Sequence, residues 1–209
     1  MFNLPPSARV ERIIPKTKFY ERTHISTAVR DEFTSVIGRI TWQYKLAENT
    51  LNIPATDAVQ EIQIFQIELK QKVIPRKALA IIDKAIPYPI LFVLAHRSDT
   101  CFVVQHKLNA KRRYYKTEWN RLPQLTFTGA TLEAIYNRMI LSSIFIDVAS
   151  GEAEYLSFEE KIEQNDKREQ LQKDIAALEN KIRSERQFSK KVALNAELQR
   201  AREQLSNLT

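Results

Sequence analysis

The sequence predicts an α+β head followed by a helical arm. Within residues 1–150, apolar residues recur with a period of two in some segments and at three-to-four-residue spacing in others, as strands and helices of one domain do. After Gly151 the chain contains no further glycine or proline, and strong helix formers predominate. We therefore expect a globular head over residues 1–150 and a C-terminal coiled-coil arm over residues 151–209.

Helical and strand patterns alternate irregularly along the head. Several expected strands follow one another with no helix between them, which favours a mixed or largely antiparallel sheet with packed helices. A phase slip at Ile64-Phe65 suggests a β-bulge there. The expected elements, in order, are a helix near residues 27–38 that Gly38 closes, strands from Arg39 to Leu46 and from Ile62 to Leu69, a helix between Pro75 and Pro87, a hairpin of residues 90–94 and 101–104, and a helix capped by Thr131.

The arm carries two runs of apolar residues with the alternating spacing of a coiled-coil seam, and the runs are out of phase with each other. A turn within residues 184–189, with Ser189 capping the second helix, would fold the arm into a hairpin. Because neither glycine nor proline marks this turn, one continuous helix that pairs with a second copy or with another protein is the alternative. The expected partner-binding residues are Leu171, Ile175, Leu178, Ile182, Leu194, Leu198 and Leu205.

Composition excludes several classes of protein. Cys101 is the single cysteine, so the chain forms no internal disulfide and no thiolate zinc cluster, and its apolar neighbours predict a core thiol. Three glycines are too few for a phosphate-binding loop or a dinucleotide fingerprint. The histidines at 24, 96 and 106 lack metal-ligand spacing. We expect no cofactor, no membrane span, no secretory signal and a cytoplasmic location.

The strongest functional signal is a basic and aromatic stretch within residues 107–121. The formal charge of +7 makes an anionic partner plausible, and this stretch combines cations for phosphates with rings for base stacking. A structural alternative is that the rings pack into the core while the cations are merely solvated. The predicted nucleic-acid-binding residues are Lys107, Lys111, Arg112, Arg113, Tyr114, Lys116, Trp119 and Arg121.

A second hypothesis is a divalent-metal nuclease. Glu68-Leu69-Lys70 ends a hydrophobic strand, as the carboxylate-x-lysine element of many metal-dependent nucleases does, and Asp57 or Glu61 would supply the second carboxylate for Mg²⁺. The tripeptide is common, and the exposed face of an amphipathic strand explains Glu68 and Lys70 equally well.

Residues 40–47, 61–65 and 82–92, together with the segment from Glu185 to Asn195, resemble an uncharacterised prokaryotic family, domain of unknown function 4391. The resemblance brings no catalytic residues. It implies a setting beside DNA methyltransferases and helicases of restriction-like or phage-defence systems, which favours an accessory subunit. The basic head and the helical arm agree with this, so the leading hypothesis is a non-enzymatic subunit that binds nucleic acid with its head and such an enzyme with its arm. A purely structural adaptor is the third hypothesis.

Overall fold

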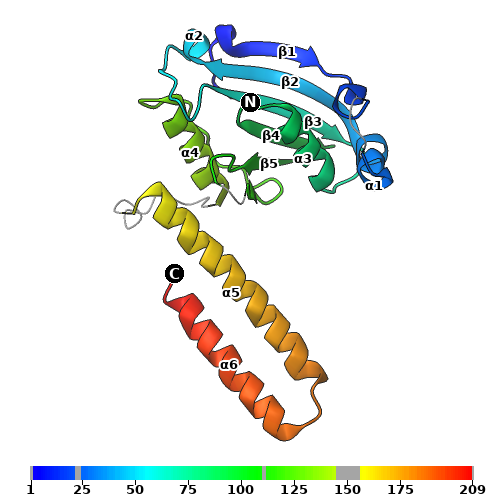
Figure 1. The fold of residues 1–209 in the computed structure, drawn as a ribbon, viewed down its shortest axis with the longest axis vertical. Coiled ribbons are helices and arrows are strands. Elements are labelled where there is room, and N and C mark those ends of the chain that lie inside the picture. The colour runs from blue at the N-terminus through cyan, green and yellow to red at the C-terminus, as the bar shows by residue number, and fades with distance from the viewer. Residues whose placement is uncertain (1, 22–24, 110–111, 145–155, 209) are drawn as a thin grey trace. The chain divides into compact units, whose positions relative to one another are not determined.

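The computed structural model describes residues 2–21, 25–109, 112–144 and 156–208. The chain divides into two compact units, Met1–Ser150 and Gly151–Thr209, which are described separately. The first unit is built on a mixed six-stranded sheet whose strands lie in sequence order (Figure 1). The strands are β1 (Arg9–Ile13), β2 (Ile37–Ala47), β3 (Glu61–Leu69), β4 (Ile90–His96), β5 (Asp99–Gln105) and β6 (Tyr114–Lys116).

Neighbouring strands are antiparallel except for β3 and β4, which are parallel. A parallel pair needs a crossover connection, and α3 (Arg76–Ala85) supplies it. The remaining helical segments of this unit are η1 (Pro6–Ala8), η2 (Lys16–Phe19), α1 (Thr27–Asp31), the π-helical turn η3 (Glu32–Val36), α2 (Glu48–Leu51) and α4 (Leu132–Ile144). The predicted α+β class with a mixed sheet is confirmed.

Both faces of the central strands are covered. On one face, Phe65 and Ile67 of β3 and Phe92 of β4 are buried with Leu79 and Ile82 of α3 in one cluster. The opposite face carries the alternate residues of the same strands, such as the fully buried Ile62, Leu91 and Val104, and α4 contacts β3, β5 and β6 there. Cys101 is buried, as predicted.

The predicted bulge lies on the other strand of the pair. The register of β2 against β3 shifts between Trp42 and Tyr44, which makes Gln43 the extra residue. β3 itself alternates without interruption. Ile64 and Phe65 are consecutive apolar residues because each faces a different covered side of the sheet, and a strand buried on both sides loses its polar alternation.

The first helix is shorter than predicted, because α1 and η3 end at Val36 and Gly38 is already the second residue of β2. A Cβ atom at Gly38 would lie 3.1 Å from the carbonyl oxygen of Glu68. Glycine therefore permits close approach of β3 and does not close a helix. The N-terminal segment contains β1, an antiparallel edge strand.

The second unit is a helical hairpin of α5 (Phe158–Ser184) and α6 (Phe188–Ser206), which run antiparallel (Figure 1). The Arg202 guanidinium lies 2.8 Å from the Glu179 carboxylate and links the two helices. The arm thus forms the hairpin and not one continuous helix. The predicted cap was wrong, because Ser189 lies inside α6 and the N-cap residue of this helix is Gln187. In the turn, the Glu185 carboxylate accepts hydrogen bonds from the backbone amides of Arg186 and Gln187, both at 2.8 Å.

The seam residues lie on the facing sides of the hairpin. Leu198 is buried, and the others are half-buried: Leu171, Ile175, Leu178, Ile182, Leu194 and Leu205. Among the described helices of the whole chain, none combines the length and apolar character needed to span a membrane.

Packing of this seam is testable at Leu198. Leu198→Ala should destabilise the hairpin by about 2 kcal/mol, since a buried leucine loses both its transfer free energy and its packing. Val192, in the same helix, is 53% exposed, and Val192→Ala should change stability by less than ~0.5 kcal/mol. Helicity of the full chain against temperature, measured by circular dichroism, gives the comparison. Equal effects of the two substitutions would contradict this packing.

Candidate nucleic-acid interface and binding pocket

Lys107, the first cation of the basic stretch, closes the C-terminal end of α3. Its ammonium donates to the carbonyl oxygens of Asp83, Ile86 and Tyr88 at 2.9, 2.5 and 2.7 Å, and it lies 3.5 Å from the Asp83 carboxylate. Carbonyl groups at a helix C-terminus lack partners within the helix and attract cations. Lys107 thus holds α3 to the rest of the head.

Tyr114 and Tyr136 complete this buried network. The Tyr114 hydroxyl donates to Asp83, while the Tyr136 hydroxyl donates to the Gln105 carbonyl and accepts the Lys107 amide at 2.8 Å. Burial raises the pKa of Asp83 to about 6, against the opposing effects of the Tyr114 hydrogen bond and the Lys107 charge. Burial also lowers the pKa of Lys107 and raises the pKa values of both tyrosines. These residues therefore have a structural place inside the head.

The other rings of the stretch also pack inward. Tyr115 is only 3% exposed. Trp119 is half-buried against the α3 side of the core, and the Lys72 ammonium lies 5.5 Å from its ring centroid. These rings therefore pack against the core, as the structural alternative to base stacking predicted. Little ring surface is left on which bases could stack.

The cations of the stretch are distributed unevenly. Arg112, Lys116 and Arg121 are exposed, although Arg121 lies 4.0 Å from the Glu118 carboxylate. Arg113 is half-buried with its guanidinium 6.0 Å from the Tyr115 ring centroid. Lys111 lies outside the described residues.

The outer side of α3 is a basic surface that the sequence analysis missed. Arg76, Lys77 and Lys84 are exposed there, while Asp83, the one acidic residue of this helix, is buried. Over the whole sequence, residues 1–150 contain 21 Lys and Arg against 13 Asp and Glu, whereas residues 151–209 contain 11 against 12. The signal in the sequence was an amphipathic helix, α3, whose exposed charged residues are all positive.

The carboxylates of the nuclease hypothesis are not brought together. Glu68 pairs with Arg39 at 2.9 Å and Glu61 with Lys45 at 3.1 Å. The two glutamates lie at opposite ends of β3, about 23 Å apart at the rise of an extended strand. Lys70 donates to the carbonyl of Thr34 at 2.7 Å. Among the described residues, no group of three or more His, Cys, Asp or Glu side chains is arranged to hold a metal ion.

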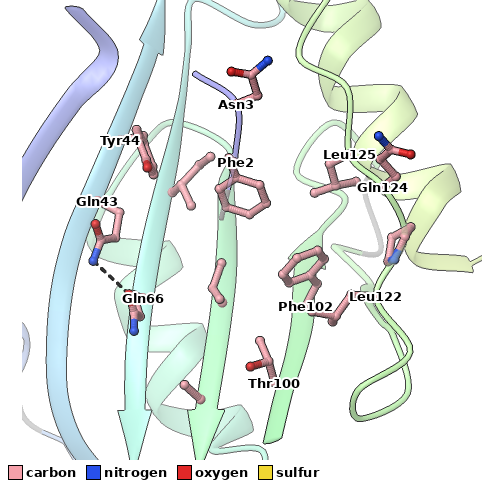
Figure 2. Close-up of a pocket in the computed structure, with 14 residues that line it drawn as sticks. Phe2, Asn3, Gln43, Tyr44, Gln66, Thr100, Phe102, Leu122, Gln124 and Leu125 are labelled. Carbon is pink, nitrogen blue, oxygen red and sulfur yellow. Dashed lines mark hydrogen bonds between the residues drawn. The ribbon is translucent and has the colours of Figure 1, made fainter. Parts of the chain in front are cut away.

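A pocket of about 470 Å³ opens on the face of the sheet opposite α3 (Figure 2). The bulge in β2 turns Gln43 toward it, and the Gln43 amide donates to the side-chain oxygen of Gln66 on β3 at 2.9 Å. Phe2 lies over the sheet, with its ring centroid 5.7 Å from that of Phe102. The described lining residues are Phe2, Asn3, Gln43, Tyr44, Ile64, Gln66, Val93, Ala95, Thr100, Phe102, Leu122, Pro123, Gln124 and Leu125, and no charged side chain is among them.

The fold and these sites define a two-unit protein: a mixed-sheet α+β head with a basic helix and an uncharged pocket, and a helical hairpin. The sequence profile of a family described only as domain of unknown function (DUF4391) matches residues 2–205, so the chain belongs to this family, as its sequence resemblance predicted. No curated protein and no solved structure shows significant similarity to the chain.

Because Asp83 is buried, the free energy of unfolding of the head should depend on pH. Its folded pKa of about 6 lies above the ordinary value of 3.8, so folding takes up a proton between these values and stability falls as pH rises from about 4 to about 6, by at most about 3 kcal/mol. Asp83→Asn should remove this dependence. Urea unfolding followed by tryptophan fluorescence measures it, since Trp42 and Trp119 both lie in the head.

Asp57 is exposed and precedes β3, so Asp57→Asn is the matched control and should keep the slope of the unmodified protein. An identical slope in Asp83→Asn and the unmodified protein would show that Asp83 does not titrate in this window.

Proposed function

We propose that the protein is a non-enzymatic accessory subunit of a DNA restriction-modification or phage-defence type system. Its head binds nucleic acid through basic side chains, and its arm binds a larger enzyme, such as a DNA methyltransferase or helicase. The observation that supports this most is the outer side of α3, whose exposed charged residues, Arg76, Lys77 and Lys84, are all basic. The cellular setting comes from the family resemblance alone.

These three cations are suited to phosphate contacts because they are exposed and have no ion-pair partner in the described part of the chain. Arg39, Lys45 and Lys72, in contrast, each pair with a carboxylate. A cation without a carboxylate partner can neutralise a phosphate and release its counterion, which drives nucleic-acid binding. The neighbouring elements η2 and α1 contact α3 and add the exposed Lys18 and Arg30.

The hairpin shifts the proposed docking surface of the arm. Since the seam residues are buried or half-buried in the hairpin, a partner enzyme would meet the outer faces of these helices. Phe188 is 82% exposed and Val192, one turn later, is 53% exposed. Together they form an apolar patch beside the hairpin turn, flanked by the exposed Lys190 and Lys191.

The head surface is tested by the salt dependence of binding to labelled duplex DNA. Replacing Arg76, Lys77 and Lys84 together by Gln should weaken binding and flatten the slope of log K against log salt by up to about 0.9 for each phosphate that is no longer neutralised. A control variant replaces three exposed arm lysines, Lys173, Lys181 and Lys190, by Gln. It removes the same charge and should keep the slope.

The same assay, run with and without Mg²⁺, separates the alternatives. Binding that does not depend on salt would contradict the proposed interface. Cleavage of DNA that requires Mg²⁺ and disappears in Glu68→Ala would replace the proposal with the nuclease hypothesis. An absence of both binding and cleavage would leave the structural adaptor.

A further inference from the structure

We propose that the uncharged pocket on the face of the sheet opposite α3 binds a nucleobase, either in a free nucleoside or as an unpaired base of a nucleic-acid strand. The strand form of this inference rests on the proposed nucleic-acid binding, whereas the nucleoside form does not. The pocket volume of about 470 Å³ lies within the roughly 300–1,000 Å³ typical of small-molecule sites.

The lining of the pocket selects a neutral ligand. Its side chains are aromatic, aliphatic, hydroxyl or amide groups, and none of them is charged. An ionised group would lose its hydration here without gaining an opposite charge. A base can enter, while the phosphates of a nucleotide would stay in solvent or on cations outside the lining.

The Gln43–Gln66 pair provides the hydrogen-bonding edge. In the bond between them, the NH₂ group of Gln43 donates to the carbonyl oxygen of Gln66 (Figure 2). The pair then presents one free amide NH₂ group and one free carbonyl oxygen, whichever way the two amides are turned. Within the described residues, neither of these groups has a hydrogen-bond partner. The free donor of one glutamine and the free acceptor of the other can each bind a polar group on the edge of a base.

Two strands hold this edge in position. Gln66 belongs to β3, a strand covered on both faces, and Gln43 is the bulge residue of β2. Without the bulge, Gln43 and Tyr44 would point to opposite faces of the sheet; with it, both line the pocket. Bulges commonly redirect a side chain beside a functional site.

Aromatic and apolar groups surround the amide pair. The ring of Phe2 is half-buried and faces the space beside Phe102 (Figure 2), so it offers a surface on which a base can stack. On the other side, Leu122 is 39% exposed although it lines the pocket. A bound planar ring would cover both.

Binding is tested on the full-length chain with unphosphorylated nucleosides, observed through the side-chain amide resonances of Gln43 and Gln66. The nucleosides should shift these resonances, and inorganic phosphate should neither shift them nor compete. Gln66→Leu keeps the size of the side chain but removes its hydrogen bonds, and should weaken nucleoside binding about tenfold. Gln60→Leu, at an exposed position just before β3, is the control and should bind as the unmodified protein does.

Single-stranded DNA distinguishes the two sources of the base. If unpaired bases enter the pocket, Gln66→Leu weakens single-stranded binding and leaves duplex binding with its salt slope intact. If only free nucleosides enter, both DNA forms bind Gln66→Leu normally. Amide resonances that do not respond to any nucleoside, or unchanged nucleoside affinity in Gln66→Leu, would overturn the inference. Duplex binding through α3 would survive that result, so the two proposals fail separately.

Discussion

The parallel pairing of β3 and β4 is the constraint from which the rest of the head follows. Strands in register from Gln63 opposite Ile90 to Glu68 opposite Ala95 can run in the same direction only if the chain returns along one face of the sheet. The return is α3, which buries Leu79 and Ile82 on that face. The crossover thereby exposes the basic side of α3 and leaves the opposite face to α4 and the pocket.

The crossover also buries polar groups at the end of α3, and residues of the basic stretch form hydrogen bonds with them. Because α3 ends beside the sheet, its last carbonyl groups and the Asp83 carboxyl are removed from water. Lys107 donates to these carbonyl groups and Tyr114 to the Asp83 carboxyl, while Tyr136 accepts the Lys107 amide. Lys107 and Tyr114, which the sequence suited to nucleic acid, are thus explained by the polar requirements of a helix end, while α3 itself carries cations without a carboxylate partner in the described part of the chain.

Two surfaces with different chemistry lie on opposite faces of one sheet. Phe65 and Phe92 point toward α3, and the adjacent Gln66 and Val93 line the pocket, as strand alternation requires. The α3 side offers charge and suits a backbone of phosphates. The pocket offers shape, ring surface and one amide edge, and suits a neutral base. Each surface can therefore be altered without changing the other.

Local patterns in the sequence determined the α+β class, the helical arm and the family, because periodicity and helix propensity act over neighbouring residues. The tertiary structure decided the rest. Whether Lys107 meets a phosphate or the end of α3, whether Glu61 and Glu68 meet at all, and where the bulge at Gln43 points all depend on strand pairing between distant segments. The pocket draws on the N-terminal segment, four strands and the loop of residues 122–125, and only folding brings them together.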